Sequence, residues 1–278
     1  MEAATIPAGP AGLDRGDAKK RRLRRRLRTA ALITLNLAVF FSLWQLLAAK
    51  EVLDPLFFPK PTDTFQALID GFKDGELTEA VLWSLENFFI GMVAAAAVGI
   101  PVGLLMGTNK TVGLLLSPYV WSMASLPRVA ITPLLILILG FSQEAELALI
   151  FLSAVFPIII NCMAGPKTVD PSLLRAGRVF GASKFQLYLR VVFPFTLPFV
   201  VSGLNQGLTR GLVGMIIAEI FGGNKGLGYL IQRAGQTFDS PLLYACLLVL
   251  IVISLTLVQS LNWLERKVAP WRAQGVEA

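Results

Sequence analysis

The sequence predicts an all-α integral membrane protein with six transmembrane helices and both termini in the cytoplasm. Three observations predict this fold class. Hydrophobic residues fill 55% of the 278 positions and charged residues only 15%, whereas about a quarter of a soluble domain is charged. The apolar residues lie in long blocks, and about 20 such residues in a row cross a bilayer. Basic residues gather beside alternate blocks, as they do in cytoplasmic loops.

A basic segment precedes the first apolar block. It contains eight cations, namely Lys19, Lys20, Arg21, Arg22, Arg24, Arg25, Arg26 and Arg28. Such a run is able to bind nucleic acid, but its position beside a membrane span favours contact with anionic lipid headgroups. We therefore expect residues 1–28 to be a mobile basic tail in the cytoplasm, with no nucleic-acid partner.

Residues 29–49 form the first predicted transmembrane helix. Ala48 and Ala49 also fit the small-residue cleavage site of a signal peptide. However, the apolar stretch is longer than the usual signal core of about 7 to 15 residues. An uncleaved membrane anchor is therefore the preferred interpretation.

The charges of the loops set the predicted orientation. Residues 50–80 carry seven acids against three lysines, so this segment is predicted to be an external loop. A core domain follows at 81–265, with spans at about 84–107, 118–141, 144–165, 194–220 and 241–263. The loop at 166–193 has five basic residues and one acid, which places it in the cytoplasm. The basic tail at 266–278 is cytoplasmic by the same rule.

The third span is the least regular. Residues 112–141 are too long for one straight crossing, and Pro127 and Pro133 interrupt them. We expect a break or a short surface helix before the crossing itself.

The second and fifth spans carry small residues at every fourth position. One stripe consists of Gly91, Ala95, Gly99, Gly103 and Gly107, and the other of Gly203, Gly207 and Gly211. Small residues let helices approach closely in lipid. The stripes predict close packing within the subunit or across a dimer, with general flexibility as the alternative.

The 166–193 loop carries the signals of two short helices. Asp170 followed by Pro171 predicts a capped helix start, and Gly181 is suited to end that helix. Ser183 with Gln186 predicts a capping box that begins a second short helix. The expected product is a basic and apolar helix–turn–helix at the cytoplasmic membrane surface.

No feature of the sequence predicts an enzyme or a metal site. The chain has no histidine, the side chain that most often serves as general base or metal ligand. Cys162 and Cys246 lie inside apolar blocks and are expected to be buried thiols. A rigid exposed loop between two spans suits docking to a cytoplasmic partner, whose motion it passes to the spans. An amphipathic loop that rests on lipid headgroups is the alternative.

Four residues of the loop carry a resemblance to a known family. Gly181, Val191, Phe193 and Pro194 fall where the permeases of type I ATP-binding-cassette (ABC) importers have the glycine and the Ile-x-Leu-Pro-like ending of their EAA loop. The resemblance covers roughly residues 80–265. Three segments look most like the branch that handles nitrate, sulfonates, taurine or pyrimidine precursors, namely 58–61, 226–231 and 264–267.

The chain departs from the family at the motif that names the loop. It has Arg175-Ala176-Gly177 where the family has Glu-Ala-Ala. The spacing to Gly181 and Pro194 is kept, so the loop fold is expected to be kept, whereas Arg175 is expected to meet an acidic surface of the ATPase instead. By resemblance, the coupling residues are Leu174, Arg175, Ala176, Gly177, Gly181, Ser183 and Pro194.

The resemblance implies an alternating-access permease in the bacterial cytoplasmic membrane. Its implied partners are a cytoplasmic ABC ATPase dimer, an external substrate-binding protein and a second permease subunit, identical or not. The chain has only the end of a phosphate loop, at residues 165–168. We therefore expect no cofactor on this chain, and ATP and Mg²⁺ on the ATPase. The implied cargo is a small solute such as nitrate, a sulfonate, taurine or a pyrimidine precursor, with an anion among the candidates.

Polar residues inside the spans are costly and mark candidate pathway positions. They are Arg128, Asn205, Gln206, Arg210 and Glu219. At 100° per residue, Gln206 and Arg210 share one face of the fifth span, and Asn205 and Glu219 share another. We expect Gln206 and Arg210 to line the pathway, with a structural salt bridge as the alternative. Arg128 is a second candidate, unless it snorkels to the inner headgroups.

Two other functions stay open on the sequence alone. One is a secondary transporter or channel subunit that needs no ATPase. Ion-gradient coupling usually leaves carboxylates near the membrane centre, whereas Glu219 lies close to one end of its span. The other is a membrane assembly factor that moves no solute.

Overall fold

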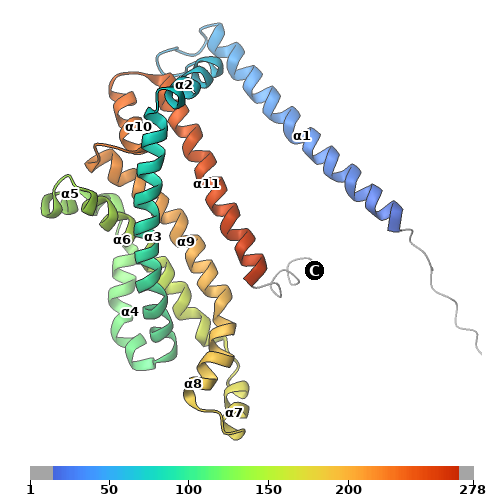
Figure 1. Ribbon diagram of the computed structural model, residues 1–278, viewed down its shortest axis with the longest axis vertical. Helices are drawn as coiled ribbons and strands as arrows, with labels where there is room; N and C mark the ends of the chain where they lie inside the picture. Colours follow the sequence, from blue (N-terminus) through green and yellow to red (C-terminus); the bar gives the residue numbers. More distant parts are fainter. Residues whose placement is uncertain (1–14, 269–278) are drawn as a thin grey trace, which may run out of the picture. The chain divides into compact units, whose positions relative to one another are not determined.

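The computed structural model describes residues 15–268, and the regular structure in this part is entirely helical (Figure 1). Five single helices are long and apolar enough to cross a membrane: Leu27–Ala49, Glu76–Thr108, Gln143–Thr168, Lys184–Gly222 and Ser240–Trp263. A bent helix pair provides a sixth candidate. The all-α membrane fold is therefore confirmed, with five single spans and one broken one.

The N-terminal part, up to Asp63, is a compact unit of its own. Helix α1 (Arg15–Ala49) begins at Arg15, so the basic residues after it are helical rather than a mobile tail, because Arg, Lys and Leu all favour helices. After α1, the Thr62 N–H donates to Oε1 of Gln45 at 3.3 Å. Residues 1–14 and 269–278, which belong to the two predicted tails, lie outside the described residues.

Three helices make the core of the second unit, which begins at Thr64. Helix α6 (Gln143–Ala164) packs along both α3 (Glu76–Thr108) and α9 (Phe193–Gly222). A Cβ added to Gly99 of α3 or to Gly207 of α9 would come within 2.9 Å of Ile158 in α6. The predicted close packing of the glycine stripes is thus confirmed within the subunit, with α6 between them.

The third predicted span is broken in its middle. Helix α4 (Lys110–Ser125) and helix α5 (Arg128–Leu139) meet at an angle of 96°. The break was expected, but it falls at Leu126 and Pro127, inside the predicted span 118–141. Pro127 has no N–H to continue α4, and a proline disfavours the helical conformation of the residue before it.

The two ends of the α3–α6–α9 bundle carry different helices (Figure 1). At one end lie α10 (Leu227–Gln236) and the start of α11 (Ser240–Val268). At the other lie α7 (Pro171–Val179) and α8 (Lys184–Leu187). The segment predicted as an external loop, 50–80, contains α2 (Pro61–Lys73) and the first turn of α3, and α10 was not predicted as a helix.

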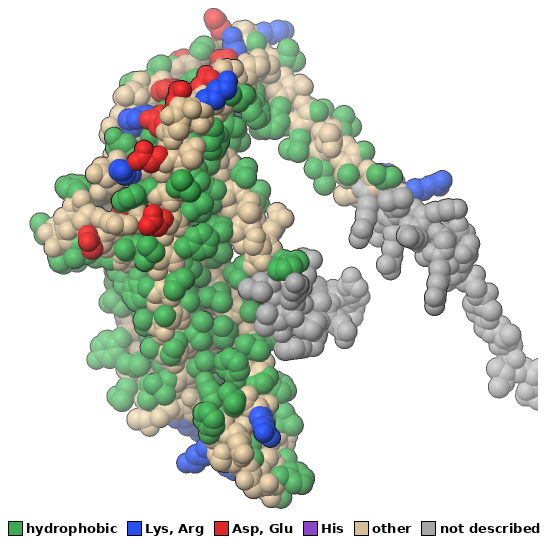
Figure 2. Space-filling view, in the orientation of Figure 1, with side chains coloured by type: hydrophobic (Ala, Val, Ile, Leu, Met, Phe, Trp, Pro, Cys, Tyr) green, Lys and Arg blue, Asp and Glu red, His purple; other side chains and the backbone are tan. Residues whose placement is uncertain are grey.

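Charged side chains differ between these ends. On the face that Figure 2 shows, Asp and Glu gather near α10 together with some Lys and Arg, whereas the charged side chains near α7 and α8 are Lys and Arg. The long middle of the bundle is covered by hydrophobic side chains on this face. Cys162 and Cys246 are buried free thiols, as predicted.

Candidate functional site

The first candidate site is the 166–193 loop, and local hydrogen bonds fix its shape. The Ser172 N–H donates to Oδ1 of Asp170 at 2.7 Å, with Pro171 at the first position of α7. Because Asp170 accepts this bond, its pKa lies below the usual value. The predicted start of the first short helix is therefore confirmed.

The turn after α7 is closed at Gly181, which has φ +77°. The Gly181 N–H donates to the Arg178 carbonyl, and the Ala182 N–H donates to the Gly177 carbonyl. These two bonds form a Schellman motif, which needs the left-handed conformation that glycine adopts without strain. Ser183 and Gln186 then form both bonds of the predicted capping box.

Side-chain packing holds α7 against α8. A Cβ on Gly177 would overlap Cδ2 of Leu187, and Leu187 is the buried residue of α8. Leu174 is half-buried, whereas Arg175 and Ala176 are exposed. In the Arg175-Ala176-Gly177 motif, the glycine therefore serves the packing of the loop, and the first two side chains are free to meet another molecule.

The surface of the loop combines exposed aromatic and basic side chains. Phe180 is 88% exposed and Phe185 70% exposed. Arg175, Arg178 and Lys184 are exposed around them. Large exposed aromatic side chains on a rigid, charged element are typical of a docking surface.

Helix α8 does not end before the fifth span, which differs from the short separate helix that was expected. Lys184–Gly222 is continuous over 39 residues, with a π-helical turn at Tyr188–Val192. The Phe193 N–H reaches back five residues to the Tyr188 carbonyl. This wider turn precedes Pro194, which would otherwise disturb an α-helix at the same place. The loop is thus rigidly joined to α9.

The second candidate site is a polar face between α9 and α11, here called the Arg210 face. It lines a pocket formed by Asn205, Gln206, Thr209, Arg210, Val258 and Asn262. Asn205 donates to Asn262 at 2.8 Å, and Gln206 donates to Asn161 at 3.3 Å. The structure thus places Asn205 beside Gln206 and Arg210, whereas the helix angles alone put it on another face.

Arg128 lies at the break between α4 and α5. Its Nη1 donates to the carbonyls of Met123 and Leu126, at 2.7 and 2.9 Å. Its guanidinium stands over the Phe156 ring, 5.3 Å from the centroid. These bonds satisfy carbonyls at the end of α4. The charge of Arg128 also lies close enough to Arg210 for the two to repel each other.

Glu219 lies apart from the Arg210 face. It is fully buried, with 0% exposure, near the end of α9. Its carboxylate accepts from the Ser84 hydroxyl at 2.6 Å and from the Gly228 N–H at 2.7 Å, and Ser84 in turn accepts from the Leu227 N–H. Gly226 leaves room for this carboxylate. These bonds tie α3, α9 and the start of α10 together, so Glu219 has a structural setting.

A second buried carboxylate was not singled out from the sequence. Glu146 of α6, 3% exposed, accepts from Trp83 at 3.2 Å and from Asn87 at 2.8 Å. Gln143 donates to the Asn87 side chain at 2.7 Å. The sequence signal that could have revealed this cluster is the presence of Glu146, Asn87 and Trp83 within or beside apolar spans. In the described part of the chain, no three possible metal ligands come together.

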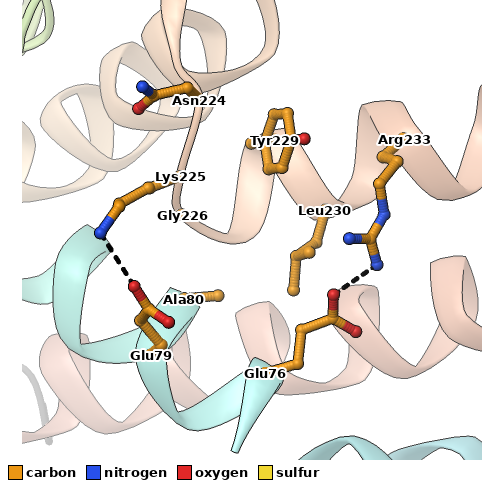
Figure 3. Close-up of a pocket in the computed structure, with 9 residues that line it drawn as sticks. All are labelled: Glu76, Glu79, Ala80, Asn224, Lys225, Gly226, Tyr229, Leu230 and Arg233. Atoms are coloured by element: carbon orange, nitrogen blue, oxygen red, sulfur yellow. Dashed lines mark hydrogen bonds and ion pairs between the residues drawn. The ribbon is translucent and has the colours of Figure 1, made fainter.

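Ion pairs surround a pocket at the α10 end of the bundle (Figure 3). Lys225 pairs with Glu79 at 2.9 Å, and Arg233 pairs with Glu76 at 2.5 Å. Both pairs join α3 to the segment around α10 and are partly exposed. Exposed pairs of this kind add little stability, so their main effect is a charged, polar rim.

Comparison with known proteins places these features in context. Residues 99–272 match the family described as binding-protein-dependent transport system inner membrane component. The chain is 31% identical over 262 residues to the taurine transport system permease protein TauC of Escherichia coli, covering 91% of this chain and 95% of that one. It is also 31% identical to the putative aliphatic sulfonates transport permease protein SsuC of Bacillus subtilis, covering 84% and 85%.

Two further likenesses extend the comparison. The formylaminopyrimidine transport permease protein ThiX of Halalkalibacterium halodurans is 28% identical, with 86% of this chain and 95% of that protein covered. Among solved structures, an inward-facing MetNI methionine ABC transporter matches with a TM-score of 0.62 at 20% identity, covering 70% of this chain and 96% of that chain. The latter likeness concerns the fold.

Proposed function

Since the chain belongs to the family of binding-protein-dependent transport system inner membrane components and is the permease component of an ABC importer, we propose that its 166–193 loop docks on a separate ATPase and that its Arg210 face lines the substrate pathway. The expected family and the expected ABC permease fold are both confirmed. Coupling, pathway, cargo and partners are proposed from the features that follow.

The observation that carries the coupling proposal is the rigid junction between the loop and α9. Two caps and the contact of Gly177 with Leu187 fix the loop, and α8 continues into α9 without a gap. At 1.5 Å per residue, the 39 continuous residues span about 58 Å. A partner that binds Phe180 and Arg175 can therefore move one continuous helix that extends through the membrane. ATP and Mg²⁺ bind to that partner and not to this chain.

We also propose that the α7–α8 end faces the cytoplasm of a bacterial cell and the α10 end faces outward. The support is the distribution of charge, with basic side chains near α7 and α8 and most of the acids, mixed with some basic side chains, near α10 (Figure 2). An even number of crossings then leaves both termini in the cytoplasm. An external substrate-binding protein meets the α10 end, where the ion-paired pocket offers a charged rim.

The pathway requires a second permease subunit. Gln206, Thr209 and Arg210 are exposed on a membrane-spanning helix, and lipid does not solvate such groups. A second subunit, identical or related, covers this face and encloses water and cargo against it. The polar side chains then avoid the energetic cost of contact with lipid. The proposed cargo is a small polar solute of the kind named for the relatives.

The test is purification of the tagged full-length chain from its native host in mild detergent. We expect an ABC ATPase to copurify, and membrane vesicles that hold the complex to take up taurine or an alkanesulfonate only with ATP and the binding protein present. Uptake driven by an ion gradient, with no ATPase attached, would contradict the proposal and support a secondary transporter. An ATPase-free complex without any transport would support an assembly factor.

A further inference from the structure

We propose that Arg210, with Asn262 beside it, forms a binding site for a small oxyanion, such as a sulfonate, in the middle of the membrane. The inference rests on the proposed pathway and names the chemical class of its cargo. It assigns recognition of this group to the permease itself, at the Arg210 face.

The first argument is an unbalanced positive charge. Arg128 and Arg210 repel each other, and arginine stays protonated in proteins. Arg128 is partly compensated by the carbonyls at the end of α4. Arg210 is exposed and has no hydrogen bond or ion pair with any described residue. A cation held inside a membrane span needs a counter-charge, and the described part of this chain offers Arg210 none.

The buried carboxylates are not available for that role. Glu219 is engaged by Ser84 and by the Gly228 N–H. Glu146 is engaged by Trp83 and Asn87. Among the described residues, neither buried carboxylate supplies the counter-charge, and we assign that role to another molecule.

The neighbours of Arg210 supply further donors. Asn205 donates to Oδ1 of Asn262, which leaves the Asn262 amide N–H groups without a partner among the described residues. Asn262 lines the same pocket as Arg210. A guanidinium with an amide donor beside it matches the several acceptor oxygens of a sulfonate.

Depth argues against a lipid headgroup as the anion. Arg210 lies 12 residues before Gly222, the end of α9, and 17 residues after Phe193, its start. At 1.5 Å per residue, these separations are about 18 Å and about 26 Å. An arginine side chain is too short to reach a lipid phosphate across either distance. A small solute in the pathway is the source that fits this depth.

A second copy of the chain would bring Glu86 as a competing counter-charge. Glu86 is exposed on α3, two residues after Ser84, whose hydroxyl bonds to Glu219. It therefore lies about 10 Å nearer the α10 end than Arg210 does, a separation that an arginine and a glutamate side chain can bridge together. An ion pair between Glu86 of one subunit and Arg210 of the other would occupy Arg210 permanently and leave no anion site. The experiment therefore includes a substitution of Glu86.

The test uses the complex that is purified through the tagged full-length chain, placed in nanodiscs of zwitterionic phosphatidylcholine. Ethanesulfonate is titrated and its binding is followed by saturation-transfer NMR, with the neutral ethyl methyl sulfone as the matched probe. We expect ethanesulfonate to bind and the sulfone not to bind. Arg210→Gln should weaken binding roughly tenfold to a hundredfold, the usual effect of losing a hydrogen bond to a charged group, and Arg210→Lys should keep part of it. The control Lys110→Gln removes an exposed charge elsewhere and should change nothing.

Several results would overturn the inference. They are equal binding of the sulfone, unchanged binding in Arg210→Gln with a native elution profile and circular dichroism spectrum, and loss of binding when phosphatidylglycerol replaces the neutral lipid, which would identify a headgroup as the ligand. Binding that arises only in Glu86→Gln would identify the ion pair between subunits. Copurification of the ATPase is scored separately, so a failed titration with the ATPase attached rejects the anion site and leaves the proposed function standing.

Discussion

The Ser84 hydroxyl donates a 2.6 Å hydrogen bond to the Glu219 carboxylate and so links α3 to the end of α9. The same hydroxyl oxygen accepts from the Leu227 N–H at 2.9 Å. One small side chain thus satisfies a buried carboxylate and the first N–H of α10. Its removal leaves Oε1 of Glu219 and the Leu227 N–H without these hydrogen bonds.

We predict that Ser84→Ala lowers the stability of the protein by about 2 kcal/mol, since a buried carboxyl oxygen and the Leu227 N–H each lose a hydrogen-bond partner. The check is the midpoint of thermal unfolding in detergent. Ser125→Ala is the matched control, because Ser125 is exposed and bonds to a carbonyl of its own helix. Equal midpoints for the two variants would show that the Ser84 bond contributes nothing.

The contact between Gly177 and Leu187 predicts a compensating pair of substitutions. Gly177→Ala should reduce ATP-dependent uptake several-fold, because its Cβ overlaps Leu187 and separates α7 from α8. Leu187→Ala should restore much of that loss when combined with Gly177→Ala, since it opens the required space. Transport by the single and double variants, at equal amounts in the membrane, measures this. A double variant as defective as the sum of its parts would argue against the packing explanation.

The exposed aromatic side chains of the loop predict a specific assembly defect. Phe180→Ser together with Phe185→Ser should reduce copurification of the ATPase at least tenfold, as expected when anchor residues of an interface are removed. The permease should still fold, because both rings are largely exposed. Phe141→Ser, at an exposed position in the turn between α5 and α6, is the control. If the loop variant retains the ATPase as well as this control does, the rings are not the anchors.

Asp170 predicts a dependence on pH. Its pKa is lowered in the folded protein by the bonds from Ser172, so its capping contribution is present above the unfolded pKa and is lost as the pH falls through the folded value. The hydrogen-exchange protection of the first amides of α7 should therefore decline below about pH 4. Asp170→Asn, which caps without ionising, should remove this decline. Identical pH profiles for both proteins would exclude Asp170 as its source.

Features set by near neighbours in the chain were predictable from the sequence. The caps at Asp170 and Ser183 and the turn at Gly181 depend on residues within about five positions, so the sequence predicts them and the structure has them. The stripes of small residues also predict that α3 and α9 each pack closely against a neighbouring helix, which is α6 for both. Each of these features uses a periodicity or a motif that one segment contains in full.

Features that depend on two distant segments were not predictable. Ser84 and Glu219 are 135 residues apart, and Asn205 and Asn262 are 57 apart. A helical wheel describes one helix, so it separated Asn205 from Gln206, although α11 closes a pocket over both. The π-helical turn was missed for a different reason. Pro194 predicts a disturbed helix, yet a break and a wider turn both accommodate it.

The glycine contacts on both sides of α6 restrict how this protein can move. Because α3 and α9 each press their backbones against the same helix, α6 has no freedom to slide or twist past either of them without forcing atoms into one another. The three helices therefore form one rigid body. Any opening and closing of the transporter must tilt this rigid body as a whole, with adjustment confined to the less tightly packed elements beside it, such as the angled pair α4 and α5.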